Sequence, residues 1–332
     1  MKRLKKQEAG QNEISAIYTF SLGKIPQKVL IEGRRKDLPV VIALHGGPGT
    51  PVPFSVGGRG MFPEFTDRFL MVSWDQLGCG INDYKLNENF TISFFVDMTA
   101  ELIREIKKLF PENQLILFGM SWGSVLALKV LEKAGTEVDA VVVWGQVLKK
   151  LFFNEEVYAA LEQAGFSDNN MQRVRAITAD NFTDKDMQFM AKSIRKHTDG
   201  YTNRKGKRIP LFPVIRGLLM SKDYNLKDFK AVMVNGTVSA TWLWKELLKI
   251  DLTKCLSGVE VPYYILQGDT DIVTSTAEVK RQAECSGNPN LHCQVIAHSG
   301  HMPGMEGMEA VLETLVSAAG GQKEQPRAKK DC

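Results

Sequence analysis

Gly119-Met120-Ser121-Trp122-Gly123 follows the apolar run Gln114-Leu115-Ile116-Leu117 and Phe118, and this stretch decides the fold. The apolar run is typical of a buried strand, and the residues after it predict a sharp turn into a helix at Ser121. Such a turn crowds the serine against its neighbours, so glycines two positions before and two after let strand and helix approach closely. The G-x-S-x-G spacing therefore predicts a nucleophile elbow, with the Ser121 hydroxyl projecting from the end of a sheet.

Strand and helix patterns alternate on both sides of this elbow. Runs typical of strands, most of them apolar throughout as in strands buried on both faces, occur at Pro39–Leu44, Phe69–Trp74, Val138–Trp144, Val261–Gln267 and Cys293–Ala297. Amphipathic helices are expected at about Phe95–Phe110, Trp122–Ala134 and Met305–Ala318. This alternation predicts an α/β fold, with a mostly parallel sheet flanked by helices on both faces. Residues from about Ile14 to Glu32 alternate apolar and polar and predict an antiparallel edge hairpin.

The alternation stops between about Gly145 and Thr253. That segment has a helical and irregular pattern with charged stretches, and the strand pattern resumes after it. We therefore interpret residues 146–253 as a helical cap insertion, and residues 1–145 and 254–319 as the core. Residues 320–332 are predicted to form a disordered tail.

Composition argues against several classes of protein. The chain has 332 residues and a formal net charge of +4 that is not concentrated in one half, which predicts no nucleic-acid or anionic-membrane partner. The basic cluster Arg204–Arg208 is interpreted as a solvated loop. No run approaches the roughly 20 apolar residues that a membrane helix needs. The charged start is not followed by the apolar segment of a secretory signal.

The cysteines and histidines favour a reduced protein without a metal. Five cysteines form no C-x-x-C pair, which indicates reduced thiols in the cytoplasm. None stands at an elbow, so a cysteine nucleophile has no support. The histidines form no HExxH motif, and the close pair His298 and His301 does not indicate a metal site. The sequence implies no cofactor and specifies no oligomeric state.

The base that would activate Ser121 is expected to be a histidine. A serine hydroxyl is a poor nucleophile at neutral pH, and the pKa of histidine suits a base that works there. His301 follows the last predicted strand, directly after a glycine, in a loop that opens into the final helix. His298 lies three residues earlier and is the alternative. We favour His301 because Gly-His after the last strand is the usual loop form of this arrangement.

A carboxylate should orient that imidazole and stabilise its cation. Gly268-Asp269-Thr270-Asp271 follows the preceding strand and offers two. Asp271 lies in the loop beyond the strand end, where its side chain can reach a histidine. Asp269 is the alternative, and we interpret it as a residue that caps or tightens the turn. We favour Asp271 as the acid.

The glycine-rich stretch His45-Gly46-Gly47-Pro48-Gly49 follows a predicted strand and suits an oxyanion hole. Glycines leave backbone N–H groups open to a reacting oxygen, and proline fixes the turn without adding a donor. We assign one donor to the N–H of Gly47 and the other to the N–H of Trp122, directly after the nucleophile. His45 is interpreted as a structural residue under the loop.

Three stretches together resemble the proline iminopeptidase (prolyl aminopeptidase) family of α/β-hydrolases: His45–Gly49, Trp74–Gly80 and Gly119–Ser124. The resemblance implies an α/β-hydrolase fold and a catalytic triad of Ser121, Asp271 and His301, in the chain order typical of that fold. It also implies an aminopeptidase that releases an N-terminal proline or small residue from short peptides. Leu77 stands where these proteins usually carry arginine, which weakens the peptidase assignment more than the hydrolase one.

Substrate choice is expected to depend on the insertion. An aminopeptidase must pair a free ammonium group with a carboxylate, and family members supply it from the cap. Glu246 is the preferred candidate, with Trp242 and Trp244 as walls of a proline pocket. Weaker candidates for the same role are Glu155, Glu156 and Glu162.

Two other functions stay open. The same residues would serve an esterase or amidase that acts on a small substrate without a free amine. A hydrolase-fold protein that binds a ligand and turns it over slowly or not at all is the second alternative. An epoxide hydrolase or dehalogenase is disfavoured, since those enzymes need a carboxylate where Ser121 stands.

Overall fold

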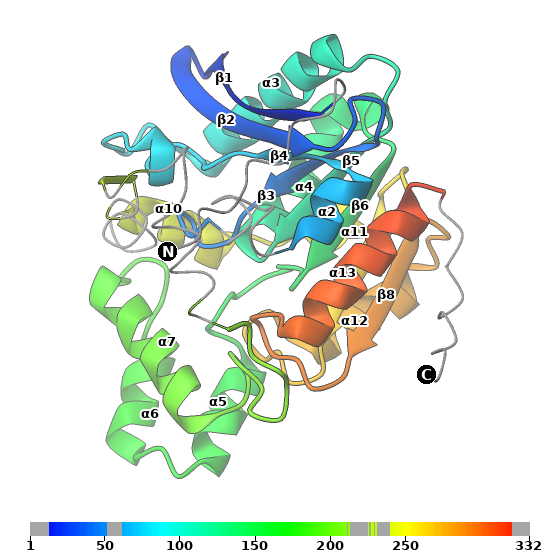
Figure 1. The fold of residues 1–332 in the computed structure, drawn as a ribbon. Helices are drawn as coiled ribbons and strands as arrows, with labels where there is room; N and C mark the ends of the chain where they lie inside the picture. The colour runs from blue at the N-terminus through cyan, green and yellow to red at the C-terminus, as the bar shows by residue number, and fades with distance from the viewer. Residues whose placement is uncertain are drawn as a thin grey trace, which may run out of the picture.

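The computed structural model describes residues 13–51, 62–210, 212, 225, 227–228, 230 and 240–320. Within these residues an eight-stranded sheet forms the centre of the molecule, and helices cover both of its faces (Figure 1). The predicted fold class is confirmed. The predicted disordered tail lies outside the described residues except for Gly320, as does part of the predicted insertion.

The sheet is parallel except at one edge. Its strands are β1 (Ile14–Leu22), β2 (Ile25–Gly33), β3 (Val40–Leu44), β4 (Leu70–Ser73), β5 (Leu115–Met120), β6 (Ala140–Trp144), β7 (Tyr263–Gly268) and β8 (Leu291–Ile296). They lie in the order β1-β2-β4-β3-β5-β6-β7-β8. β1 and β2 form the predicted antiparallel hairpin, β2 pairs antiparallel with β4, and the other pairs are parallel. The carboxyl ends of β3 and β5 to β8 therefore meet at one edge, where α/β proteins place their sites.

Helices cover the two faces of the sheet. They are α2 (Pro63–Arg68), α3 (Ile92–Leu109), α4 (Trp122–Ala134), α11 (Thr253–Ser257), α12 (Thr276–Ser286) and α13 (Met305–Ala318), with 3-10 turns η2 (Gly80–Asn82) and η3 (Gly135–Glu137). α3, α4 and α12 pack on one face, and α2 and α13 on the other. Successive strand residues serve opposite faces: Ile42 packs toward α3 and α4, whereas Val41 packs toward α2 and α13. Burial on both faces explains the apolar runs that the sequence shows.

The structure adds three helices, α2, α11 and α12, that the sequence pattern does not predict. α2 has only six residues, and α12 buries only Val279, so neither produces a clear apolar period. The helix expected from Phe95 begins three residues earlier, at Ile92. Thr91 caps it, with its hydroxyl accepting a hydrogen bond from the Phe94 N–H at 3.3 Å.

Between β6 and β7 the described residues are mainly helical. The helices are α5 (Glu155–Gln163), α6 (Asp168–Arg175), α7 (Asp184–His197) and α10 (Thr241–Lys249). α5, α6 and α7 form a group beyond the sheet (Figure 1). This agrees with a helical insertion, while its boundaries stay a prediction. In the part of the chain that the structure describes, no helix combines the length and apolarity needed to cross a lipid bilayer.

Candidate active site

The elbow is a strained turn between β5 and α4. Ser121 has φ 51° and ψ −116°, a backbone conformation that is rare for a residue with a side chain. A Cβ at Gly123 would lie 1.9 Å from the Leu44 carbonyl oxygen, and a Cβ at Gly119 would lie 2.6 Å from the Gly123 carbonyl oxygen. Only glycine fits at either position. The G-x-S-x-G spacing is thus required by the close approach of strand and helix.

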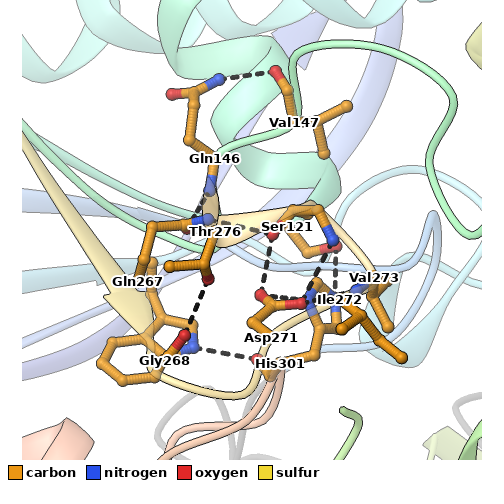
Figure 2. Close-up of polar contacts among 12 residues, drawn as sticks. Ser121, Gln146, Val147, Gln267, Gly268, Asp271, Ile272, Val273, Thr276 and His301 are labelled. Atoms are coloured by element: carbon orange, nitrogen blue, oxygen red, sulfur yellow. Dashed lines mark hydrogen bonds and ion pairs between the residues drawn. The ribbon is translucent and has the colours of Figure 1, made fainter. Parts of the chain in front are cut away.

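Ser121, His301 and Asp271 form a hydrogen-bonded series at the carboxyl edge of the sheet (Figure 2). His301 Nε2 lies 2.9 Å from Ser121 Oγ, and His301 Nδ1 lies 2.9 Å from Asp271 Oδ2. A carboxylate only accepts, so Nδ1 carries the proton and Nε2 accepts from the serine hydroxyl. All three side chains are buried. The structure thus brings together the three residues selected from the sequence.

Asp271 is held by its own loop. Its Oδ1 accepts hydrogen bonds from the N–H groups of Val273 at 2.8 Å and Thr274 at 3.1 Å. Its Oδ2 accepts from Thr274 Oγ1 at 2.7 Å as well as from His301. These bonds fix the carboxylate in the plane that the imidazole needs. Sequence reasoning missed Thr274, although Asp-x-x-Thr is a common turn pattern that could have shown it.

The two alternatives, His298 and Asp269, bond to each other's loops outside this series. His298 is exposed, and its N–H donates to Asp269 Oδ2 at 3.0 Å. Asp269 Oδ1 accepts from the Ser299 N–H, also at 3.0 Å. Asp269 therefore tightens the loop that leads to His301, as the sequence interpretation proposed.

The glycine-rich loop lies against the elbow. The Thr50 N–H donates to the Gly46 carbonyl oxygen at 3.0 Å and closes the loop. A Cβ at Gly46 would lie 3.5 Å from the Ser121 Cβ, and Gly47 has φ 116°, in the left-handed region that favours glycine. The segments that carry the N–H groups of Gly47 and Trp122 therefore flank Ser121.

Gln76 connects these two segments and was not singled out from the sequence. Its side-chain oxygen accepts from Trp122 Nε1 at 2.7 Å, and its side-chain nitrogen donates to the His45 carbonyl oxygen at 3.2 Å. Its backbone N–H donates to His45 Nε2 at 2.9 Å. Gln76 is buried, so these contacts fix the position of the glycine-rich loop relative to the elbow.

His45 has a structural role under the loop. Burial lowers the pKa of His45 to about 4, against a small opposing effect of its hydrogen bond with the Gly46 carbonyl oxygen. The ring is therefore neutral at pH 7, which lets Nε2 accept from Gln76. Burial also raises the pKa of the neighbouring Cys79 thiol, with the charges of Asp75 and Asp83 acting in the same direction. A buried, protonated thiol is a poor nucleophile.

Two of the three preferred substrate residues bond to the segment that begins α3. Glu246 Oε2 accepts from the Ile92 N–H at 2.9 Å, so its carboxylate lies at the N-terminus of α3, where the helix dipole stabilises it. Trp242 Nε1 donates to the Phe90 carbonyl oxygen at 3.2 Å. Both residues thus hold α10 on the core. Trp244 alone of the three lines the cavity described next.

A cavity of about 340 Å³ adjoins the glycine-rich loop. It is lined by Pro48, Gly49, Gln76, Leu77, Gly78, Asp83, Tyr84, Lys85, Leu86, Phe95, Ala240 and Trp244. Ring contacts connect the cavity with the elbow in one direction and with His301 in the other. The Phe95 ring packs edge-on against Trp122. The Trp244 ring contacts Phe152, which in turn contacts His301. The walls are mainly apolar, and among the described lining residues Asp83 is the acidic one.

The weaker acidic candidates lie elsewhere on the insertion. Glu155 and Glu162 both pair with Arg175 on the exposed side of α5. Glu156 is half-buried and bonded to Ser275, and burial raises its pKa, with the charge of Asp271 adding to the effect. Across the described residues, no three His, Cys, Asp or Glu side chains are grouped to hold a metal ion.

Three residues around His301 escaped sequence reasoning. Gly145 has φ 66°, which favours glycine, and a Cβ there would lie 3.3 Å from His301 Nδ1, a tight contact with the imidazole. The rings of Phe152 and Tyr201 lie 6.1 Å and 5.8 Å from the imidazole, between ring centres. Both rings come from the insertion, and no short motif marks them.

Comparison with known proteins agrees with the observed fold. The family model of the alpha/beta hydrolase fold matches residues 39–308. The chain belongs to the α/β-hydrolase family. The probable aminopeptidase YbaC of Bacillus subtilis (strain 168) is 24% identical over 314 residues, which cover 92% of this chain and 96% of that protein.

Two further relatives carry related names. The proline iminopeptidase of Neisseria gonorrhoeae is 35% identical over 127 residues, 38% of each protein. A crystal structure of a proline iminopeptidase-related protein from Thermus thermophilus has a TM-score of 0.60 and 20% identity, and the match covers 92% of this chain and 98% of that one. The resemblance to proline iminopeptidases is confirmed as a similarity of sequence and of fold. Identities this low do not transfer a substrate.

Proposed function

We propose that this α/β-hydrolase is a serine hydrolase that works through a covalent acyl-enzyme, and that it acts as an aminopeptidase on short peptides with an N-terminal proline or small residue. The observation that carries the proposal is the series Ser121–His301–Asp271, with both hydrogen-bond distances at 2.9 Å. A serine nucleophile needs a base within that reach, and the base needs an orienting carboxylate.

Each proton in the proposed reaction moves through His301. Ser121 Oγ bonds to the carbonyl carbon while its proton passes to His301 Nε2, and the Asp271 carboxylate stabilises the imidazolium. His301 then gives this proton to the leaving amine, the C–N bond breaks, and an ester of Ser121 remains. Water attacks the ester while His301 takes its proton. The same proton returns to Ser121 Oγ as the acid leaves.

The N–H groups of Gly47 and Trp122 are assigned to the oxyanion that forms during attack. Trp122 is the first residue of α4, and the first N–H groups of a helix have no partner within the helix. The positive end of the helix dipole favours negative charge at the same place. Loss of one such donor typically lowers the rate by roughly a hundred- to a thousandfold.

The apolar cavity beside the glycine-rich loop is assigned to the N-terminal residue of the peptide. Leu77, Leu86 and Phe95 suit an apolar side chain such as proline. Asp83, which also lines the cavity, is assigned to the substrate ammonium in place of Glu246. The similarity to a probable aminopeptidase over 92% of this chain supports the same substrate class.

We place the reaction in the cytoplasm. Cys79, Cys255, Cys285 and Cys293 are free thiols, which fits a reducing compartment.

Fluorophosphonate labelling tests the nucleophile, and a substrate panel tests the substrate. The wild-type chain should be labelled at Ser121, and Ser121→Ala should abolish both labelling and turnover. Labelling that persists in this variant would refute the assignment. Prolyl-anilide and alanyl-anilide should be cleaved, and Asp83→Asn should raise KM for both by roughly two- to fivefold, as expected for one lost ion pair at an exposed carboxylate, while short acyl esters are unaffected. Ligand-induced stabilisation without labelling or turnover would instead favour a hydrolase-fold binding protein.

The second candidate is an esterase or amidase that acts on small substrates without a free amine. Two observations favour it. The Glu246 carboxylate is bonded to the Ile92 N–H, and Leu77 gives the cavity an apolar wall where related sequences usually carry arginine. Turnover of short acyl esters with no turnover of aminoacyl anilides would establish this candidate and remove the peptidase.

A further inference from the structure

Residues 198–208 lie along the loop that carries His301, and we call them the strap. They follow α7 within the predicted insertion and include the basic cluster Arg204–Arg208. The His301 N–H donates to the Gly200 carbonyl oxygen at 3.0 Å, and the Met302 N–H donates to the Tyr201 carbonyl oxygen at 2.9 Å. Farther along, the Met305 N–H donates to the Lys207 carbonyl oxygen at 2.9 Å. The strap is therefore bonded along the histidine loop through its backbone carbonyl groups.

The two backbones approach too closely for most side chains. A Cβ at Gly206 would lie 2.1 Å from the His298 carbonyl oxygen. A Cβ at Gly300 would lie 3.0 Å from the carbonyl oxygens of Asp199 and Tyr201. The side chains of the basic cluster are exposed, as interpreted from the sequence, but its backbone is packed against the site.

Asn203 joins the strap to the turn that precedes His301. It is 6% exposed, and its side-chain nitrogen lies 3.3 Å from Asp269 Oδ1 and 3.4 Å from Thr270 Oγ1. Its side-chain oxygen accepts from the Lys205 N–H at 2.9 Å, which sets the side-chain orientation. Asp269 in turn accepts from the N–H groups of His298 and Ser299, as described above. One buried amide thus connects the strap, the aspartate loop and the histidine loop.

The position of His301 in the sheet explains why it needs such support. His301 follows β8, which is the last strand in the order of the described sheet, so no further strand of that sheet flanks the loop. The strap instead bonds to the loop that follows β8. Tyr201 adds its ring to one side of the imidazole, and the Arg195 guanidinium lies 4.1 Å from the centre of that ring.

We infer that the strap holds His301 in reach of Ser121, and that Asn203 is its positioning residue. The inference rests on the proposed serine hydrolase mechanism. A base that is displaced by about 1 Å can lower a rate by roughly a hundredfold, so the strap bonds matter for proton transfer and not only for folding.

Asn203→Asp tests this with a change of almost no volume. The new carboxylate faces Asp269, so repulsion should part the strap from the histidine loop. Thr202→Asp is the matched control, since it adds the same charge at the neighbouring exposed position. The maximal rate constant for fluorophosphonate acylation should fall roughly 10- to 100-fold in Asn203→Asp, with reagent affinity unchanged, and stay within about twofold in the control.

Amide hydrogen exchange gives a second measurement that does not depend on Ser121 chemistry. Peptides covering residues 298–302 should exchange faster in Asn203→Asp than in Thr202→Asp. The double variant Asn203→Asp with Asp269→Asn restores one amide and one carboxylate, and it should recover part of the acylation rate and of the protection.

The outcomes separate the inference from the proposed function. Unchanged exchange in Asn203→Asp overturns the inference, and so does faster exchange with an unchanged acylation rate. A wild-type chain that is not labelled at all removes the proposed function and, with it, the positioning role. The exchange result then shows only whether the strap holds the loop.

Discussion

The two halves of the candidate site are held together by different means. The elbow half comprises Ser121 and the glycine-rich loop, and core strands support it. There a Cβ at Gly123 would lie 1.9 Å from the end of β3, and buried Gln76 bridges both segments. Each of these contacts joins residues that lie in strands of the sheet or in the segments directly after them. The insertion contributes the Val147 N–H, which donates to Ser124 Oγ at 3.0 Å.

The base half depends on the insertion. The Asn154 side-chain nitrogen donates to the Ile272 carbonyl oxygen at 2.8 Å, and its oxygen accepts from the Val157 N–H at 3.1 Å to cap α5. The Phe152 N–H donates to the Val273 carbonyl oxygen at 3.1 Å. With the strap on the other side, both the acid loop and the base loop are bonded to residues between β6 and β7. The comparison teaches that the insertion bonds to the loops of Asp271 and His301 as well as bordering the cavity beside the glycine-rich loop.

Gly123→Ala should break the elbow half and gives the largest expected effect. The new Cβ would collide with the Leu44 carbonyl oxygen in a core that cannot yield, so we expect a loss of about 3 kcal/mol or more in the free energy of unfolding. Soluble yield and urea denaturation measure it. Gly135→Ala is the matched control, because its Cβ would meet nothing closer than 3.8 Å. Equal stability of the two variants would contradict the account of the elbow.

A lower pH should reduce the stability of the protein through His45, which lies in the elbow half. The folded-state pKa of His45 is lowered from 6.5 to about 4, so the unfolded chain binds the proton more readily. Stability is therefore complete above pH 6.5 and falls as the pH drops from 6.5 toward 4. Between pH 7 and pH 5 the loss should be about 2 kcal/mol from this group.

Urea denaturation at both pH values checks this prediction. His45→Gln cannot titrate, so its stability should fall less than that of the wild type over the same range. An equal fall in both proteins would show that other groups cause the acid sensitivity. The catalytic base should be unaffected by the substitution at pH 7 except through the position of the glycine-rich loop.

The elbow half could be predicted from the sequence because its causes are local. Ser121 and its two glycines lie within five residues, and the strand before them is apolar throughout. The order of strands brought the loops of Asp271 and His301 to one edge, since residues after neighbouring parallel strands meet there. The choice of His301 over His298 rested on the usual loop form of this arrangement, and that of Asp271 over Asp269 on its place beyond the strand end. Apolar runs gave the sheet, and the alternation of apolar and polar residues gave its edge hairpin.

The supports of the base half could not be predicted in this way. Asn203 and Asp269 are 66 residues apart, and Glu246 and Ile92 are 154 apart, so no local pattern reports either contact. The contact of Glu246 could not be read from the sequence, because a carboxylate among aromatic residues gives the same pattern whether it meets a ligand or a helix N-terminus. For the basic cluster Arg204–Arg208 the sequence indicated exposed side chains, which the structure shows. It gave no sign that the backbone of this segment packs against the histidine loop.

Gly206→Ala has the smallest expected loss of stability. It tests whether the base half is held less tightly than the elbow half. Its Cβ would lie 2.1 Å from the His298 carbonyl oxygen, nearly as close as the contact at Gly123, but the strap lies at the edge of the molecule and can move outward. A shift of roughly 1 Å should cost about 1 kcal/mol of stability and slow fluorophosphonate acylation by about tenfold or more. Denaturation and labelling, measured on the same preparation beside Gly123→Ala, give both numbers.

If Gly206→Ala loses as much stability as Gly123→Ala, the base half is as integral to the core as the elbow. If it loses neither stability nor rate, the strap does not position His301. Only slow acylation in a folded protein supports the view that the insertion controls the base.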